Sequence, residues 1–248
     1  SEVKREVVAH FEVKGTHWKA PWTHQLTFVL NVVFQLASLY YMVALRSPLL
    51  AVIHGLLRAL MVVRSTHAAS HFSFSRSPTV NRWVYRIGTV MIGLWSPTVW
   101  DLQHVVAHHI YTNEWPYDSD SAFPLKSIFP NQRRLWFHKY QHIYMWLVYC
   151  LTIPFVMLNS LRETVLGHQM LWKISYLLPG AMIESYACTF LCFVYLLCPF
   201  YFLPTSVALS LVFLSSVVSS LFFSLQFVVN HEVDGIVGTV EKPDTPGA

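Results

Sequence analysis

The hydrophobic positions along the chain fall into long segments that are separated by polar stretches. Residues 26–45 contain no charge, a second apolar segment covers residues 48–63, and a longer charge-free run extends over residues 185–231. About 20 apolar residues are enough for a helix to span a bilayer. The pattern therefore predicts an all-α fold: a polytopic integral membrane bundle of about four transmembrane helices with additional interfacial helices.

The connection between the first two apolar segments predicts a helical hairpin. Arg46-Ser47-Pro48 is short and reads as a tight turn, and proline suits the first position of the helix that follows. We expect the second helix to return the chain to the side from which the first one started. Residues 84–99 are apolar but contain Arg86, two glycines and a proline, so we expect an interfacial helix there.

The C-terminal half leaves its topology open. Three apolar segments follow at residues 143–158, 185–203 and 205–229. If His231 is to share a side with the histidines described below, an even number of these segments must cross the membrane. One of them would then lie in the interface or re-enter, and the sequence does not decide which.

Composition and charge agree with a membrane protein. Of the 248 residues 54% are hydrophobic and 12% charged, with a mean hydropathy of +0.42, which excludes an ordinary soluble domain. Basic residues gather before the first apolar segment and between the second and third, so these regions are expected on the cytosolic side. They share no face with an aromatic stacking platform, which argues against nucleic acid binding.

Domain boundaries and cysteine usage follow from the same pattern. We expect a cytosolic leader over residues 1–24, a membrane domain over residues 25–235 and a polar tail over residues 236–248. The four cysteines lie in apolar segments without a CxxC spacing, which predicts neither a disulfide framework nor a thiolate metal site.

Five histidines occur in two short runs beside apolar segments. The runs read His67-Ala-Ala-Ser-His71 and His104-Val-Val-Ala-His108-His109. Residues four apart lie on one face of a helix, so each run can present a pair of imidazole nitrogens to a metal. Such side chains are costly at a membrane unless they are partnered. All-nitrogen ligation favours Zn, Fe, Cu or Ni, and the spacing does not choose among them.

The residues around these runs resemble a known family. The chain reads HAASHFSFSRSPTVN from His67 and later WDLQHVVAHHIYTNEWPYDSD, which resembles the first two histidine boxes of membrane fatty acyl desaturases. The closest likeness is to the front-end and linoleoyl-CoA desaturase branch, of which the YTN, the Asp118 and Asp120 pair, Gln141-His142 and QFVVNHE at residues 226–232 are typical. The resemblance covers roughly residues 25–235.

This resemblance implies an oxidoreductase that uses O2 and two non-haem irons to introduce a cis double bond into a lipid acyl chain. Carried over by position, the metal ligands would be His67, His71, His104, His108, His109 and His231. Residues that orient the imidazoles or hold a water would be Asp118, Asp120, Gln226 and Asn230.

The implied partners are membrane lipids, an acyl-CoA or acyl-lipid substrate, and an electron donor. No HPGG motif precedes the first helix, so the donor is expected to be a separate protein such as cytochrome b5 or a ferredoxin, or a domain outside this chain. The protein is expected in the endoplasmic reticulum membrane if it is eukaryotic and in the cytoplasmic membrane if it is bacterial.

Two departures from the family pattern bear on activity. Ala68 stands where this branch usually has an acidic residue, and no histidine follows His231, where the family has a QxxHH box. The chain thus offers six nitrogen ligands in place of eight or more, which predicts a truncated or inactive form. Two alternatives stay open: a catalytically dead desaturase-like protein that binds or regulates a paralogue, and a related histidine-box lipid hydroxylase.

Overall fold

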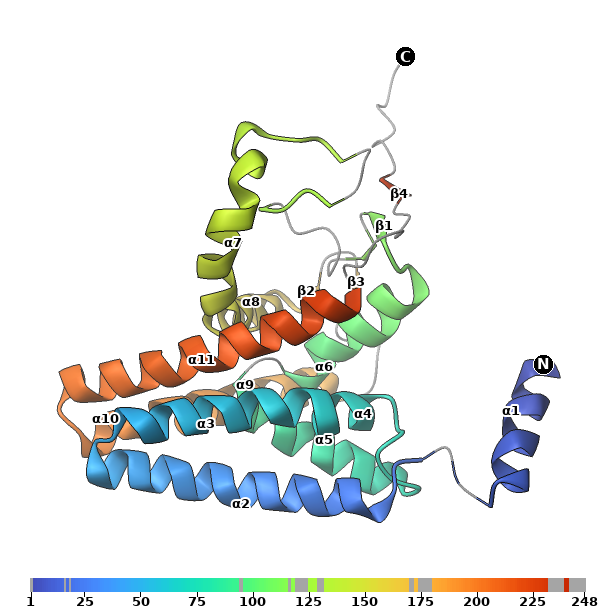
Figure 1. Ribbon diagram of the computed structural model, residues 1–248, viewed down its shortest axis with the longest axis horizontal. Coiled ribbons are helices and arrows are strands. Elements are labelled where there is room, and N and C mark those ends of the chain that lie inside the picture. The colour runs from blue at the N-terminus through green and yellow to red at the C-terminus, as the bar shows by residue number, and fades with distance from the viewer. Residues whose placement is uncertain are drawn as a thin grey trace.

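The computed structural model is almost entirely helical (Figure 1). It describes residues 2–15, 17, 19–93, 96–115, 117–118, 125–128, 132–169, 172–173, 180–231 and 239–240. The α-helices are α1 (Glu2–Val13), α2 (Trp22–Leu45), α3 (Pro48–Met61), α4 (His67–Ser70), α5 (Pro78–Ile92), α6 (Pro97–Trp100), α7 (Gln141–Cys150), α8 (Thr152–Leu166), α9 (Ala181–Leu197), α10 (Pro199–Phe202) and α11 (Thr205–His231).

The remaining elements are short. Two π-helices, η1 (Val62–Thr66) and η2 (Asp101–His108), and one 3-10 helix, η3 (Trp136–Tyr140), interrupt or extend the α-helices. The two-residue strand β1 (Glu114–Trp115) pairs in parallel with β4 (Thr239–Val240), and β2 (His168–Gln169) pairs antiparallel with β3 (Trp172–Lys173). These pairs fasten loops and leave the fold all-α, as the sequence predicts.

Among the described residues, four helices are long and apolar enough to cross a membrane, namely Trp22–Leu45, Pro48–Ser70, Ala181–Phe202 and Thr205–Val229. The expectation of about four transmembrane helices is confirmed. Of the three C-terminal segments between which the sequence did not decide, the first lies in a bent helix pair: Trp136–Cys150 and Thr152–Leu166 meet at an angle of 68°, as in a broken span or a re-entrant segment. Helix α5 is not among the candidate spans, and its interfacial position stays a prediction.

The predicted hairpin between α2 and α3 is present. Arg46 ends α2 in the left-handed region with φ 51°, and the side chain of Ser47 accepts a hydrogen bond from the Leu50 amide at 3.4 Å. Pro48 takes the first helical position, where its missing amide hydrogen costs nothing. The turn lays α3 antiparallel against α2, and α3 lies between α2 and α11 (Figure 1).

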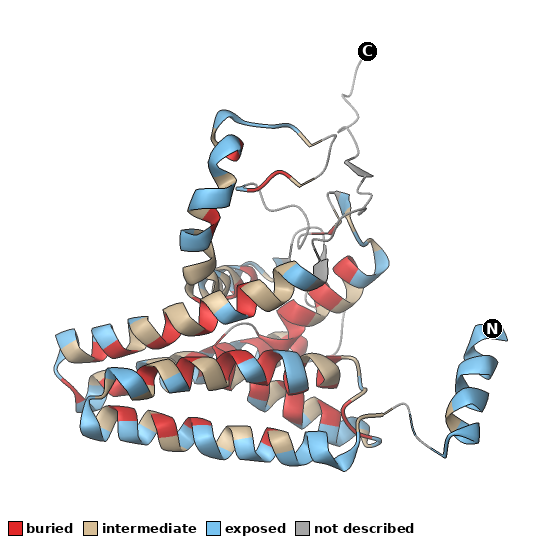
Figure 2. Ribbon diagram, viewed as in Figure 1, coloured by how far each residue is buried: buried red, intermediate tan, exposed pale blue. Residues whose placement is uncertain are grey.

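The buried side chains gather on the inner faces of the bundle, above all on α3, α5 and α6 (Figure 2). The outer faces of α2, α9 and α11 expose large apolar residues such as Val33, Phe190 and Phe213, as expected where lipid is the solvent. Helix α3 lies so close to α11 that a Cβ on Gly55 would stand 2.5 Å from the Ser215 carbonyl oxygen. Small residues at helix contacts permit this approach.

Arg58 joins three helices in the interior of the bundle. Its side chain, 1% exposed, donates to the Ile92 carbonyl oxygen from Nε at 3.1 Å and from Nη2 at 2.5 Å. Its Nη1 lies 3.5 Å from the hydroxyls of Ser215 and Ser216 on α11. Ile92 is the last residue of α5, where the carbonyl groups carry the negative end of the helix dipole. The buried cation of α3 is thus held by the end of α5.

A second polar network joins α2, α3 and α9. The His54 ring lies 3.0 Å from the Ser38 hydroxyl and 3.3 Å from the Tyr195 hydroxyl, which donates to Gln35 Oε1 at 3.2 Å. All four side chains satisfy one another away from water, as buried polar groups must in a membrane. His54 therefore belongs to the packing of the bundle.

Replacing Arg58 should destabilise the protein. An Arg58→Met variant keeps much of the side-chain volume but leaves the Ile92 carbonyl without its donor, which should cost about 1–3 kcal/mol of unfolding free energy. Thermal unfolding in detergent measures this loss, and Arg133→Met, which changes an exposed arginine, is the matched control. Equal stability of the two variants would show that the buried guanidinium does not clamp the helices.

Candidate metal centre

Both histidine runs sit on or directly after a π-helix. Helix η1 connects α3 to α4, and the His67 amide bonds to the Val62 carbonyl five residues back. Helix η2 follows α6, and the His109 amide bonds to the His104 carbonyl, again five residues back. Such i→i+5 turns are rare in proteins, and those that occur are often found at functional sites. In the second run His109 therefore lies one π-turn beyond His104, and the two rings meet edge to face.

Four histidines from the two runs form one group. The side chains are His67, His71, His104 and His109, and one candidate ligand atom from each lies within 4.8 Å of all the others. His104 Nε2 is 2.8 Å from His67 Nε2 and 3.1 Å from His109 Nε2. The spacing of four predicted the pairs His67/His71 and His104/His108; the structure brings the first pair together with His104 and His109, and His108 is not in the group.

The group has the properties of a metal site. The Nε2 atom of His71 is buried without a hydrogen-bond partner. Burial, and next the neighbouring His104 and His109, lower the pKa of His71 to about 4, so this imidazole is neutral at pH 7 and offers its lone pair. Metal–nitrogen bonds of about 2.0–2.1 Å place tetrahedral nitrogens about 3.3 Å apart, which the close His104 contacts approach. The four imidazoles could hold one metal ion.

His108 turns to a different partner. Its Nδ1 lies 3.1 Å from both carboxylate oxygens of Asp118, a fully buried side chain that also accepts the Asn113 amide at 2.7 Å. A carboxylate at Nδ1 fixes that nitrogen as the donor and places the imidazole lone pair on Nε2. Asp118 thus contacts a histidine of the second run, and its role in orienting a metal ligand stays a prediction. His108 does not belong to the group of four.

The end of α11 lies beside the histidine group. The Phe227 ring centroid is 6.4 Å from that of His104, and Gln226 is its neighbour in the chain. The backbone of α11 continues to His231, one helical turn beyond Phe227. The side chains of Asn230 and His231, and all of Asp120, lie outside the described residues. The ligand role of His231 stays a prediction.

Two neighbours of the group were not expected from the sequence. The buried Trp100 ring, 4% exposed, lies 4.4 Å from the His104 ring and 6.3 Å from the His67 ring, measured between centroids. Gly88 of α5 lies against Thr66, the residue before His67, where any added Cβ would collide with the Thr66 side chain. The tryptophan stands one turn before His104, which is the only sequence signal for its role.

The profile of the fatty acid desaturase family matches residues 45–244. This range includes both histidine runs and three of the four candidate spans, and it begins at the last residue of α2. The chain belongs to this family. It is an integral membrane protein with a histidine group at one end of an apolar helical bundle.

Individual relatives carry related names. The chain is 30% identical over 158 residues to "Acyl-lipid (7-3)-desaturase, chloroplastic" of Chlamydomonas reinhardtii, an alignment that covers 63% of this chain and 29% of that protein. It is 36% identical over 99 residues to "Probable Delta(5) fatty acid desaturase C" of Dictyostelium discoideum, covering 39% and 21%. The "sn-1 linoleoyl-lipid 6-desaturase" of Arthrospira platensis is 32% identical over 92 residues, covering 37% and 23%.

The chain spans less than a third of the length of each of these three relatives. No solved structure matches the chain.

His104 should be the histidine whose loss affects metal binding most. Its Nε2 lies nearest to two other imidazoles of the group. We expect His104→Ala to weaken Co²⁺ binding by at least about 100-fold, since a ligand and the contact between the two runs are lost together. Titration of the metal-free protein with Co²⁺ measures the effect, with His142→Ala, which changes an exposed histidine, as the control. Equal affinities of the two variants would rule out this group as the centre.

The metal-free protein should lose stability through His71 as the pH falls. The pKa of about 4 in the folded state lies below the ordinary 6.5, so the unfolded chain binds more protons between these values. The free energy of unfolding therefore decreases as the pH drops through this window. His71→Gln should flatten that dependence in thermal unfolding measured with a chelator present. Identical pH profiles of the variant and the wild type would contradict the assignment.

Proposed function

We propose that this protein is a fatty acyl desaturase that removes two hydrogens from a lipid acyl chain and leaves a cis double bond. The observation that carries the proposal is the group of four imidazoles that two separate helices bring together at one end of an apolar bundle. The desaturase names of the relatives support the same reaction. The proposed cofactors are two non-haem iron ions, with O2 as the oxidant.

The proposed reaction requires electrons and protons in addition to O2 and the acyl chain. Two hydrogens of the acyl chain, two protons and two further electrons reduce one O2 to two waters. The bound metal supplies O2 activation and the abstraction of hydrogen from an unactivated carbon. The electrons require a donor, proposed to be a separate protein such as cytochrome b5 or a ferredoxin.

The chain's own residues would hold and shield the centre. His67, His71, His104 and His109 would ligate one iron. We propose His108, oriented by Asp118, and His231 as ligands of the second iron, with Asp120, Gln226 and Asn230 nearby to orient ligands or water. Buried apolar side chains around the group, among them Trp100 and Leu102, would exclude water from the reacting carbon.

The substrate and the membrane follow from the same proposal. An acyl-lipid or acyl-CoA chain would enter between the helices of the membrane domain, proposed at residues 25–235, with the leader at residues 1–24 and the tail at residues 236–248 outside it. The relatives whose names include "acyl-lipid" favour a chain that is esterified in a membrane lipid. The membrane would be the endoplasmic reticulum in a eukaryote and the cytoplasmic membrane in a bacterium.

Lipid analysis of cells that express the chain tests this function. Fatty acid methyl esters, separated by gas chromatography and identified by mass spectrometry, should contain a new cis-unsaturated species with the wild type. The species should be absent with His104→Ala expressed to the same level, because one imidazole of the centre is gone. A hydroxylated product would assign the chain to the lipid hydroxylases, and lipid profiles that do not differ between the two would overturn the desaturase proposal.

A further inference from the structure

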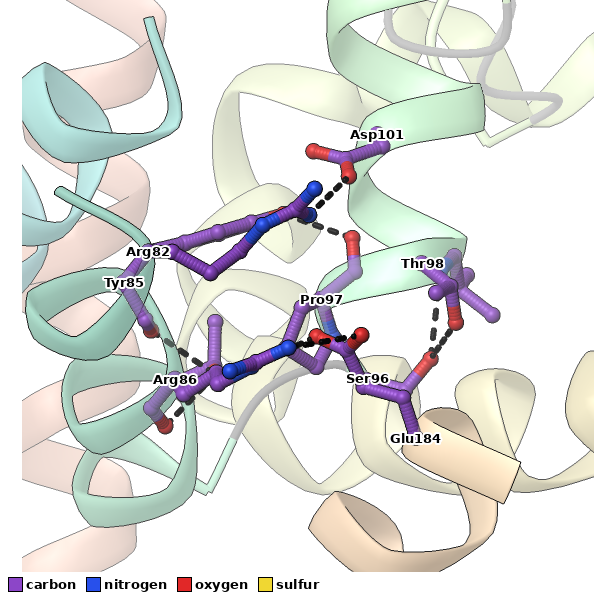
Figure 3. A network of polar contacts seen from close by, with 10 residues as sticks. Arg82, Tyr85, Arg86, Ser96, Pro97, Thr98, Asp101 and Glu184 are labelled. Atoms are coloured by element: carbon purple, nitrogen blue, oxygen red, sulfur yellow. Dashed lines mark hydrogen bonds and ion pairs between the residues drawn. The ribbon is translucent and has the colours of Figure 1, made fainter. Parts of the chain in front are cut away.

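One face of α5 reaches two neighbouring elements (Figure 3). Tyr85 and Arg86 follow Arg82 by three and four residues, so the three side chains lie on one side of the helix. Arg82 points toward Asp101 at the start of η2, and Tyr85 points toward Pro97 at the start of α6, which leads into η2. Arg86, in contrast, points toward Glu184 in the first turn of α9. Only the first of these two contacts leads to a helix that carries histidines.

The contact with η2 is made by Asp101. This residue begins η2, directly follows Trp100 and precedes His104 by three positions. Its carboxylate lies 3.9 Å from Arg82 Nη1, and the nearby Tyr85 side chain lowers the pKa of this carboxyl. The Tyr85 hydroxyl donates its one hydrogen to the Pro97 carbonyl oxygen at 2.6 Å, so this tyrosine contacts the continuous segment that leads to His104 four residues before Asp101.

Helix α5 is also in contact with the other histidine run. Gly88, one turn beyond Tyr85, packs against Thr66, the residue immediately before His67. The same helix therefore touches both segments from which the imidazoles project, and nothing larger than glycine fits the Thr66 contact. The distance between His67 and His104 therefore depends on how α5 packs against the two segments that carry these histidines.

The energetics of Asp101 are unusual for a residue that only stabilises a fold. Its side chain is 22% exposed, and burial raises its pKa to about 6, with Tyr85 and Arg82 opposing the shift. Because the folded state holds the proton more tightly than the unfolded chain, the charged carboxylate opposes folding as the pH rises from about 4 to about 6. A partly exposed ion pair at 3.9 Å offsets little of this. Groups that cost stability beside a candidate site are typical of function.

We propose that Asp101 is a positioning residue for the metal centre: through Arg82 and Tyr85 it fixes the start of η2, and with it the places of Trp100 and His104 relative to His67. The inference rests on the metal site of the proposed function. It goes beyond that function because it assigns a role to a residue that touches neither the metal nor the substrate.

The chain contains a matched control. Glu184 pairs with Arg86 at 2.9 Å and 3.1 Å, a two-point ion pair with closer contacts than that of Asp101. Glu184 belongs to α9, a helix without histidine, and contacts the same face of α5 that Asp101 contacts. A Glu184→Gln variant thus removes a carboxylate from the same neighbourhood and leaves the contact between α5 and η2 in place.

The test compares Asp101→Asn with Glu184→Gln in the full chain, by Co²⁺ titration and by thermal unfolding of the metal-free protein at pH 7. We expect Asp101→Asn to weaken Co²⁺ binding by 10–100-fold, the usual cost of losing an outer partner of a metal site, with an unfolding temperature no lower than that of the wild type. Glu184→Gln should lower the unfolding temperature and leave the Co²⁺ affinity unchanged. Asp101→Glu should recover part of the affinity.

Unchanged Co²⁺ affinity in Asp101→Asn would overturn the inference, as would an affinity loss that Glu184→Gln shares. If Asp101→Asn does not fold, Tyr85→Phe replaces it and is judged by the same criteria. A wild type that binds no Co²⁺ would overturn the metal site and this inference together. A wild type that binds Co²⁺ normally but produces no double bond in cells would leave the positioning role to be decided by the titration and would count against the desaturase proposal alone.

Discussion

The structure depends on holding four imidazole side chains together although these side chains attract one another only weakly. Close nitrogen pairs such as His104 with His67 gain one hydrogen bond at most, and His71 leaves a buried nitrogen unsatisfied. The helices that carry these residues must therefore be fixed by contacts elsewhere. Arg58 ties α3 to the end of α5, and α5 in turn packs on the turns before both runs. A cation bound between the imidazoles would stabilise this arrangement.

Much of the fold could be predicted because its signals are local. Length and apolar composition identify the four spans, and the Arg46-Ser47-Pro48 sequence predicts the turn between the first two helices. The bend near Leu151 was not predicted, since Pro154 marks a weak point in the segment but not its direction. The role of α5 was also beyond reach, because its sequence indicates only an interfacial helix and its function lies in what it touches.

The site was predicted as a set of residues but not as an arrangement. His67 and His71 share a face at the spacing of four that an α-helix predicts. In the second run the hydrogen bonding shifts to a spacing of five, which brings His109 to the group and turns His108 toward Asp118. A π-turn leaves no mark in composition or periodicity. Trp100 and Asp101 were missed for a similar reason, since a tryptophan and an aspartate beside a helix are ordinary until their neighbours are known.

The central claim is that two histidine runs converge on one metal. X-ray absorption spectroscopy of the protein loaded with one Zn²⁺ per chain tests it most directly, because imidazole rings give a multiple-scattering pattern that carboxylates and water lack. The account predicts a shell of about four nitrogens at about 2.0–2.1 Å with imidazole scattering from all of them. A shell dominated by oxygen, or one with no more than two imidazoles, would contradict it.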